Sequence, residues 1–569
     1  MPFSEETVGG TNVASTVTLR KTYNGNDGKY TAAALCRAGI ESIEAAKEYL
    51  ESDEIINPAR IRNIGKATDV IWKHVYAGNR ICVFGDYDAD GITASAIMFL
   101  ALKKLGANVS VRLPDRITEG YGISKKAIDE QLMLGTCLFV TVDNGVRAVE
   151  ETAYVKAQGC DIVILDHHEP CETLPEPDAM IDLHIKGETY PFVELTGSGL
   201  AWKVAHYMLE QSGEHEFAMS LVDLAAIGTI GDVAPLHGEN RSIVKRALRL
   251  MRQPLYKRYG VKALIRDMSH ITAEDIAFRL APCLNAPGRL NEHGASLSLI
   301  LLIEDDVRIA YDLAAKVHVQ NESRKELQNL CYEAVKVEAE QRIAKGDKVL
   351  VILSKEAPSG IAGLLVGNLK EEFGRPAIVL CPKKDLDGAV HWTGSARSIE
   401  AFHMLNAIEK CREHLLRFGG HKLAAGLTIE SDEDLLNSFR EAMNQIADSL
   451  TESDFESTML WDLDLDENEL TDSIFAEMEL LEPYGANAPR PTVKVRTTLS
   501  EGESYAFLGS NNKHVKMFAN GFTLIGFSLA DKYIEEELPG VVTAYGSISY
   551  NSYRGNLTKQ ISLLDFDAA

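Results

Sequence analysis

ICVFGDYDADGIT, residues 81–93, joins a buried strand to a cluster of acids. Four consecutive apolar residues, Ile81–Phe84, are typical of a strand that is buried on both faces. Three acids follow at alternate positions: Asp86, Asp88 and Asp90. Like charges so close together repel, and burying them unpaired is costly unless a cation neutralises them. The stretch therefore favours a divalent-cation site, and a solvated acidic turn is the alternative interpretation.

Strands and helices alternate after this stretch. Apolar periodicity predicts a helix at Ile92–Leu105, and further elements follow. The predicted strands are Val109–Leu113, Cys137–Asp143 and Asp161–Asp166, and the predicted helices between them are Lys125–Leu134 and Arg147–Gln158. Such alternation indicates crossover connections and an α/β fold with a parallel sheet.

The predicted strand ends carry further polar groups. Asp143-Asn144-Gly145 ends one strand, and Asp166-His167-His168 ends the next. The apolar helix Leu221–Leu236 contains Asp232 just after a glycine; this acid either joins the other groups or faces water in a loop. Because ligands of open α/β sheets bind beyond the carboxyl ends of the strands, we expect one site here.

The residue types at these ends indicate the chemistry. Carboxylate and imidazole ligands suit Mn²⁺ or Mg²⁺ better than a metal that prefers thiolates. The acids outnumber the needs of one ion, so two ions are expected, held by Asp88, Asp90, Asp143, His167 and Asp232. Two such ions favour hydrolysis of a phosphate ester. The sequence has no Walker-type P-loop, nucleophile elbow or dinucleotide fingerprint.

A second α/β domain is predicted after a long helical region at Ser296–Ala344, which is either a bridge between domains or a surface helix pair. Strands are expected at Val349–Leu353 and Pro376–Leu380, flanking a helix. TGSARS, residues 393–398, supplies hydroxyls and Arg397 at a predicted strand–helix junction, as a phosphate site requires. GGHKLAAG, residues 419–426, would let the backbone approach a ligand closely.

A small barrel is predicted at the C-terminal end, after the Pro/Asn-rich stretch at residues 481–491. Short strand-like runs with turns between them support it. Aromatic and basic side chains there either bind single-stranded nucleic acid or lie in solvated turns: Lys513, Lys516, Tyr550, Tyr553 and Lys559.

Composition sets limits on the function. The formal net charge of −25 argues against non-specific binding of polyanions, but leaves room for a local basic channel. Nine cysteines without a Cys-x-x-Cys pair indicate a reducing cytoplasm and no structural zinc. Neither a signal peptide nor an apolar run long enough for a membrane span is expected, and a monomer is the default.

In this order, DYDADG, DNG, DHH and GDVAPL resemble the DHH phosphoesterase superfamily, and GGHKLAAG resembles its associated second domain. The further motifs narrow the likeness to the RecJ family of single-stranded-DNA-specific exonucleases: RLPDRITEGYGIS, NAPGRL, GSARS, LEPYGANAPRP and KHVKM. The resemblance runs from about Asn79 to the C-terminus. It implies a 5′→3′ exonuclease that depends on Mn²⁺ or Mg²⁺ and acts in DNA repair and recombination, with a helicase or single-strand-binding protein as a possible partner.

The resemblance also implies roles for individual residues. The implied metal ligands are Asp86, Asp88, Asp90, Asp143, His167 and Asp232. His168 and Asp143 would be catalytic, with His168 beside the scissile phosphate. The implied substrate-binding residues are Arg116, Arg289, Ser395, Arg397, Gly419, Gly420 and His421. Gly288-Arg289 is expected in a loop.

The expected division is a helical lead-in at 1–78, a DHH catalytic domain at 79–295, a helical linker at 296–346, a DHH-associated domain at 347–454 and an OB-like barrel at 455–569. Two departures from the family stand out: Phe84 replaces a histidine of some relatives, and residues 354–363 lack a Trp-His pair. The competing hypotheses are a DHH phosphodiesterase of cyclic dinucleotides or short oligonucleotides, and a non-catalytic replication scaffold.

Overall fold

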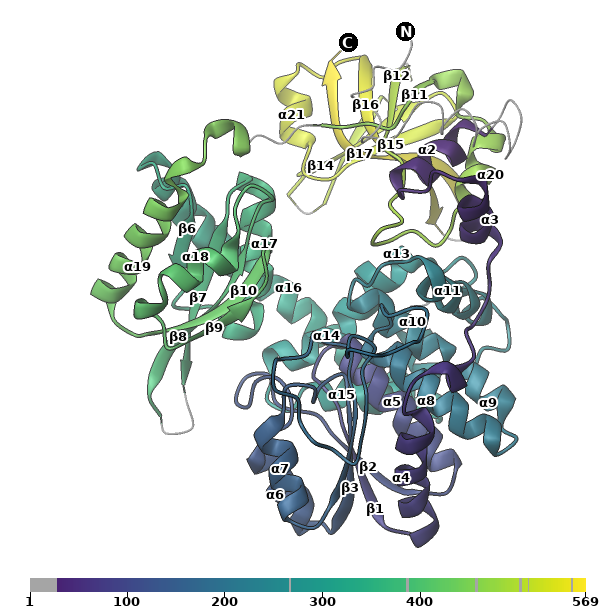
Figure 1. The fold of residues 1–569 in the computed structure, drawn as a ribbon. Coiled ribbons are helices and arrows are strands. Elements are labelled where there is room, and N and C mark those ends of the chain that lie inside the picture. The colour runs from purple at the N-terminus through teal and green to yellow at the C-terminus, as the bar shows by residue number, and fades with distance from the viewer. Residues whose placement is uncertain are drawn as a thin grey trace.

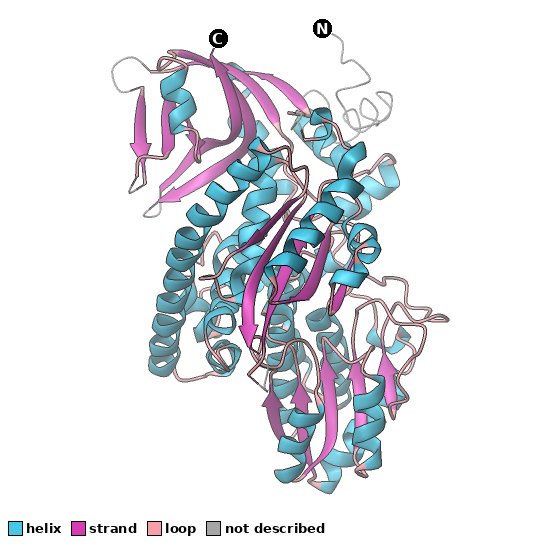
Figure 2. Ribbon diagram, turned by 90° about the vertical axis from the view of Figure 1, so that its left-hand side faces the viewer, coloured by secondary structure: helices cyan, strands magenta, loops and turns pink. Residues whose placement is uncertain are grey.

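The computed structural model describes residues 28–265, 268–384, 388–455, 459–500, 504–509, 511–553 and 556–568. Three sheets organise these residues. Figure 1 shows the first sheet at the bottom, the second at the left and the third at the top, with the helix α16 between them. Figure 2 shows the long helix running beside the sheets.

The first sheet is parallel throughout, which confirms the predicted fold class. Its strand order is β2-β1-β3-β4-β5. The strands are β1 (Arg80–Phe84), β2 (Asn108–Arg112), β3 (Thr136–Val142), β4 (Asp161–Leu165) and β5 (Ala179–Ile181).

Helices cover both faces of this sheet. Since side chains alternate along a strand, Ile81 and Val83 point to one face while Cys82 and Phe84 point to the other. The first face packs against α4 (Ile64–Ala77), α5 (Ala89–Lys104) and α8 (Gly197–Gln211), and the second against α6 (Lys125–Met133) and α7 (Val149–Ala157). The core is therefore continuous beneath the carboxyl edge of the strands.

A group of helices extends the first body. They are α9 (His215–Ser220), α10 (Val222–Gly231), α11 (Gly238–Met251), α12 (Tyr259–Leu264), α13 (Ala273–Asp275), α14 (Ala281–Leu290) and α15 (Ala295–Ile303). The expected loop at Gly288-Arg289 is wrong, because both residues lie in α14, which continues past an internal proline, Pro287.

The long helix α16 (Val307–Ala344) connects the first and second bodies. The region predicted as Ser296–Ala344 is two helices, because Asp306 caps a new helix by accepting hydrogen bonds from the Arg308 and Ile309 N–H groups. One end of α16 packs in the first core and the other, with Cys331 and Val335, in the second. Of the two interpretations, the bridge is confirmed.

The second sheet is mixed, in the order β6-β7-β8-β10-β9. Its strands are β6 (Leu350–Leu353), β7 (Ala377–Lys384), β8 (Val390–Arg397), β9 (Arg417–Gly420) and β10 (Ala424–Glu430). One face packs against α17 (Ala362–Phe373), the other against α18 (Met404–Lys410) and α19 (Glu433–Ile446). The TGSARS motif was expected at a strand–helix junction, but most of it is the end of β8, paired with β10.

The third sheet has the order β11-β12-β16-β17-β15-β14-β13. Its strands are β11 (Leu463–Asp466), β12 (Val493–Thr498), β13 (Tyr505–Leu508), β14 (His514–Ala519), β15 (Phe522–Gly526), β16 (Val541–Tyr553) and β17 (Asn556–Ala568), with helices α20 (Asp472–Leu480) and α21 (Ala530–Glu535). A bridge between Leu499 and Ala519 joins strands far apart in this order, so the sheet curls into a barrel-like form.

The first described helices belong to the core of the third sheet. Tyr30 and Leu35 of α2 (Lys29–Arg37) are fully buried with Phe475, and α3 (Ile43–Glu51) joins the same cluster. The Thr31 N–H and hydroxyl both donate to Glu477. The lead-in thus divides between two cores, because α4 packs on the first sheet. Residues 1–27 of the predicted lead-in lie outside the described residues.

Candidate functional site

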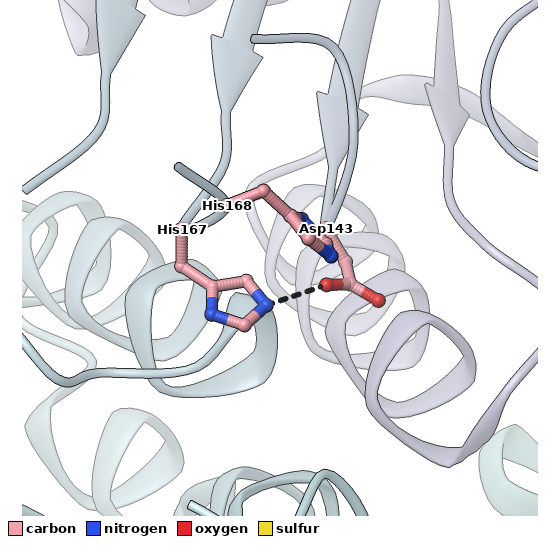
Figure 3. Close-up of side chains that lie close together, drawn as sticks. All are labelled: Asp143, His167 and His168. Carbon is pink, nitrogen blue, oxygen red and sulfur yellow. Dashed lines mark hydrogen bonds and ion pairs between the residues drawn. The ribbon is translucent and has the colours of Figure 1, made fainter. Parts of the chain in front are cut away.

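The predicted ligands meet at the carboxyl edge of the first sheet. β1 leads into the three alternate acids, β3 into Asp143, and β4 into the Asp-His-His triplet, while α10 delivers Asp232 as its C-cap residue. Figure 3 shows Asp143 and His167 facing each other from neighbouring strand ends, with His168 beside them. The His167 Nε2 atom lies 3.1 Å from Asp143 Oδ1.

Three overlapping groups of side chains place their ligand atoms within 4.8 Å of one another. The groups are Asp86/Asp88/Asp143, Asp90/His167/Asp232 and Asp143/His167/His168. All six predicted metal ligands and His168 are thereby brought together. Since Asp143 and His167 each belong to two groups, the arrangement offers two adjacent cation positions with shared ligands.

Local sequence explains how β1 presents its acids. Asp88 is the N-cap of α5 and accepts a hydrogen bond from the Gly91 N–H at 3.1 Å. A Cβ atom at Gly91 would lie 2.6 Å from the backbone nitrogen of Asp86, so glycine permits the tight turn. Asp90 accepts a hydrogen bond at 3.0 Å from the Ser198 N–H in the first turn of α8. The positive end of the α8 dipole also stabilises this carboxylate.

The electrostatics of the cluster fit a bound cation. Burial and the neighbouring carboxylates raise the pKa of Asp143 and of Asp86 well above the ordinary value. Burial and Asp90 raise the pKa of Asp88 in the same way. Asp86 Oδ1 and Asp90 Oδ2 are buried and have no hydrogen-bond partner among the described residues. Such buried oxygens call for positive charge, and oxygen-rich sites with imidazole suit Mn²⁺ or Mg²⁺.

Asp166 behaves differently from these acids. Burial works to raise its pKa, but hydrogen bonds from His168 and the Val146 N–H outweigh burial, so the pKa is lowered. Its carboxylate lies 2.8 Å from His168 Nδ1. Burial lowers the pKa of His168, but the Asp166 partner overrides it and raises the pKa above that of free histidine. Asp166 is therefore an orienting acid, a role the sequence alone left unassigned.

The sequence interpretation also missed Tyr121. Its hydroxyl donates to the Asp143 carbonyl oxygen at 2.9 Å and lies 3.1 Å from His168 Nδ1. A pocket of about 230 Å³ opens beside it and His168. Tyr121 stands between Gly120 and Gly122, both with positive φ, so a tyrosine between two glycines was the available signal.

Two predicted arginines lie beside the acids. The Arg116 guanidinium stacks over the Tyr87 ring at 4.7 Å, and its charge acts to lower the pKa of Asp86. Burial and the nearby Arg116 charge lower the pKa of Arg289. The Arg289 Nη1 atom donates to the Gly360 carbonyl oxygen at 3.0 Å, so this residue connects the first body to the second.

The second sheet gathers the other predicted substrate residues on one face. Ser395 pairs across β10 with Gly426, which pairs in turn with Gly419 of β9. A Cβ atom at Gly363 would lie 3.6 Å from Ser395 Oγ and 3.9 Å from Arg397 Nη2. This face adjoins the turn that carries Gly360, next to Arg289.

The remaining predicted substrate residues of the second sheet are partly or fully exposed. Gly420 has a positive φ of 148° and ends β9, and the exposed His421 follows it with its N–H bonded to the Ala424 carbonyl oxygen. Burial lowers the pKa of Arg397, whose Nη1 atom donates to the Ala396 carbonyl oxygen, and no carboxylate among the described residues forms an ion pair with it. An unpaired, half-buried guanidinium on an open glycine surface is suited to bind a phosphate.

Both departures from the family pattern have a clear position. Phe84 is fully buried on the face of the sheet that packs against α6 and α7, so it lies in the core and supplies no ligand. Residues 354–363 form the turn at the start of α17, where Gly360 contacts the Arg289 backbone. The candidate ligand groups form without either histidine.

The barrel residues are partly engaged within the protein. The Tyr550 ring lies 4.9 Å from that of Phe475, and Lys559 pairs with Asp472 at 2.7 Å. Lys516 lies over the Phe518 ring. The Tyr553 side chain lies outside the described ones. Within the described ranges, every helix is too short or too polar to cross a bilayer.

Comparison with known families identifies three matched segments. The DHH family N-terminal domain matches residues 80–229, the DHHA1 domain matches 346–449, and the RecJ OB domain matches 461–565. These segments correspond to the first, second and third sheets in turn.

Individual relatives match most of the length of the chain. The single-stranded-DNA-specific exonuclease RecJ of Bacillus subtilis is 34% identical over 548 residues, covering 94% of this chain and 67% of the relative. RecJ of Escherichia coli is 32% identical, covering 79% and 80%. The crystal structure of Thermus thermophilus RecJ with Mn²⁺ superposes with a TM-score of 0.79 at 27% identity, covering 98% of this chain and 78% of that one. With its three matched domains and relatives at 30% identity or more along most of its length, this chain belongs to the RecJ family of DHH proteins.

Proposed function

We propose that this chain is a metal-dependent exonuclease that hydrolyses phosphodiester bonds of single-stranded DNA from the 5′ end, in DNA repair and recombination. The observation that carries the proposal is the single cluster of ligands at the carboxyl edge of the first sheet, which adjoins an arginine-bearing face of the second. Relatives named as single-stranded-DNA-specific exonucleases support the substrate.

The ligand groups support binding of two Mn²⁺ or Mg²⁺ ions. Asp86, Asp88 and Asp143 would hold one, Asp90, Asp232 and His167 the other, with Asp143 and His167 placed between them. Such a pair, when bound, clamps the attacking and leaving oxygens of a phosphoryl centre. The protein holds the carboxylates rigidly through the α5 cap and the α8 N-terminus.

His168 is proposed as the proton donor or orienting group at the scissile phosphate. Asp166 engages its Nδ1 atom, so the ring would act on the substrate through Nε2. The same carboxylate raises the pKa of His168 and so favours the protonated ring. Asp143 serves both as ligand and as the carbonyl partner of Tyr121.

The 5′ end is proposed to bind at Arg116, Ser395 and Arg397, with Arg289 on the backbone of the strand. The two arginines of the first body and the two residues of the second lie on either side of the contact between Arg289 and Gly360, which supports this assignment. The wall of the groove would be Gly419, Gly420 and His421, whose exposed backbone lets a strand approach closely.

We further propose the domain division 79–295, 296–346, 347–454 and 455–569. The third body favours a long polymer over a cyclic dinucleotide, because an oligonucleotide-binding fold adds contact length. Helix α2 is buried in the core of the third body, so a deletion of the barrel must also remove residues 28–52. Otherwise the apolar side chains of Tyr30 and Leu35 would become exposed. A complete ligand set opposes the scaffold hypothesis.

End-labelled digestion tests the central proposal. A single-stranded DNA labelled at one end is incubated with the protein and Mn²⁺, beside the variant Asp143→Ala. Early release of the 5′ label by the wild type alone is expected. Intact DNA, or early release of the 3′ label, would overturn the proposal or its polarity.

The 5′-end assignment has its own test. Single-stranded DNA with a 5′-phosphate should be cut faster than the same strand with a 5′-hydroxyl, and Arg397→Ala should abolish this preference. Arg412→Ala is the matched control, since Arg412 is an exposed arginine in the short turn after α18. An unchanged preference in Arg397→Ala would contradict the assignment.

The cellular setting is proposed more broadly. The nine cysteines, none of them in a Cys-x-x-Cys pair, support a reducing cytoplasm. We propose that the protein is a monomer. We also propose that it works with a helicase or a single-strand-binding protein, because its relatives are named as specific for single-stranded DNA. Light scattering of the purified protein and pull-down with candidate partners test both statements.

A further inference from the structure

A second cluster of metal-ligating side chains lies away from the catalytic centre, where α8 ends and α9 begins. It consists of His206 and Glu210 on α8 and His215 at the start of α9. Their ligand atoms lie within 4.8 Å of one another. In Figure 1 these helices lie at the right-hand side of the first body, opposite the second sheet.

The local sequence explains the juxtaposition. His206 and Glu210 are four residues apart, so they share one face of α8. Gly213, with a positive φ of 75°, turns the chain back, and His215 returns over the same carboxylate. Glu210 Oε1 lies 3.1 Å from His206 Nε2 and also contacts His215 Nδ1.

From this geometry we propose that His206, Glu210 and His215 form a zinc site. Two imidazoles and one carboxylate are a common protein ligand set for Zn²⁺, with water in the fourth position. In such a site the ligand atoms lie roughly 3.3 Å apart, given bond lengths of about 2.0 Å. Small rotations of the exposed Glu210 and His215 side chains reach this spacing.

The surroundings favour a built site over a chance surface pair. The His206 side chain is only 10% exposed, and its ring stacks on Trp202 with centroids 5.3 Å apart. One ligand is thus fixed, whereas Glu210 and His215 are 44% and 62% exposed and leave an entry path for the ion. Lys104 on α5 pairs with Glu214 instead of Glu210.

The ion would join α8 to α9. The opposite end of α8 supplies the Ser198 N–H to Asp90 and packs Gly197 against Asp143. A bound Zn²⁺ would therefore stabilise the helix that supports the catalytic acids, without contacting the substrate. This site differs in ligand chemistry from the acid-rich centre, which suits Mn²⁺ or Mg²⁺.

Zinc stoichiometry of the full-length protein tests the inference. Metal-free protein is dialysed against ZnCl₂ at micromolar concentration, and bound zinc is counted by elemental analysis. His215→Ala and Glu210→Gln should each bind one ion fewer per chain than the wild type. Their thermal unfolding without metal should match that of the wild type, because both side chains are largely exposed.

His237→Ala is the matched control. His237 Nε2 lies 2.6 Å from Glu194 Oε2, and both side chains are about as exposed as Glu210. No third ligand joins this pair in any candidate group found among the described residues. The control should keep the wild-type zinc count. Equal counts in wild type and His215→Ala, or an equal loss in His237→Ala, would overturn the inference.

Discussion

Asp143 and Asp166 end adjacent strands and are both buried, yet replacing each by asparagine should change the stability of the metal-free protein in opposite directions. Asp143 faces the His167 ring and several carboxylates, and its pKa is raised by burial and by the carboxylates. Asp166 faces hydrogen-bond donors, and its pKa is lowered. The backbone tolerates the first exchange, because asparagine, like aspartate, adopts the positive φ of 62° found at position 143.

The structure gives the size of the effect at Asp143. Two ionised carboxylates whose oxygens lie within 4.8 Å of each other repel by at least about 3 kcal/mol at an effective dielectric constant near 20. Because the acids can bind protons instead, the relief is smaller, and we expect Asp143→Asn to stabilise the metal-free protein by about 1–3 kcal/mol. At an unfolding entropy of about 2.1 cal/mol/K per residue, this corresponds to a rise in melting temperature of about 1–2.5 °C for the whole chain.

The effect at Asp166 follows from its donors. Its carboxylate accepts hydrogen bonds from the N–H groups of Val146 and His167 and from the His168 ring. A hydrogen bond to a charged group contributes about 1.5–3 kcal/mol, so Asp166→Asn should lower stability by about 2 kcal/mol.

The pH dependence of folding stability provides a second test of the direction of each effect. A raised carboxyl pKa means that the folded state binds more protons, so the Asp143 contribution to stability falls as pH rises through its folded pKa. The Asp166 contribution is present above its unfolded pKa and is lost as pH falls. Thermal unfolding in chelator, followed by circular dichroism, measures both. The reasoning fails if Asp143→Asn is the less stable protein at neutral pH.

Three further outcomes are expected. Gly91→Ala should abolish Mn²⁺ binding, measured by calorimetry, because its Cβ would lie 2.6 Å from the Asp86 backbone, whereas Gly65→Ala, with open space around it, should bind normally. Tyr121→Phe should lower kcat about tenfold with little change in KM, since it removes the hydroxyl that donates to the Asp143 carbonyl oxygen and lies beside the His168 ring; an unchanged kcat contradicts this. Mn²⁺ should raise the melting temperature more at about pH 8 than at about pH 5.5, because protons compete for acids of raised pKa; equal shifts would mean that these acids do not bind the ion.

Much of the site was predictable because its residues are tied to strand ends. In a parallel sheet, every strand that carries a polar cluster at its carboxyl end delivers it to the same edge. Asp86, Asp143 and His167 therefore met as predicted. Tyr121 was not found because it comes from a loop, whose path no periodicity describes.

The sequence by itself determined the parallel sheet, the set of acids and histidines, and the family, since short-range patterns and motifs encode all three. Only the tertiary structure decided which acids repel and which are hydrogen-bonded, because pKa values depend on neighbours distant in sequence. It also decided that α2 belongs to the third core and that Arg289 touches Gly360. Packing between segments far apart in the sequence leaves no local signal, so these contacts appear only once the chain is folded.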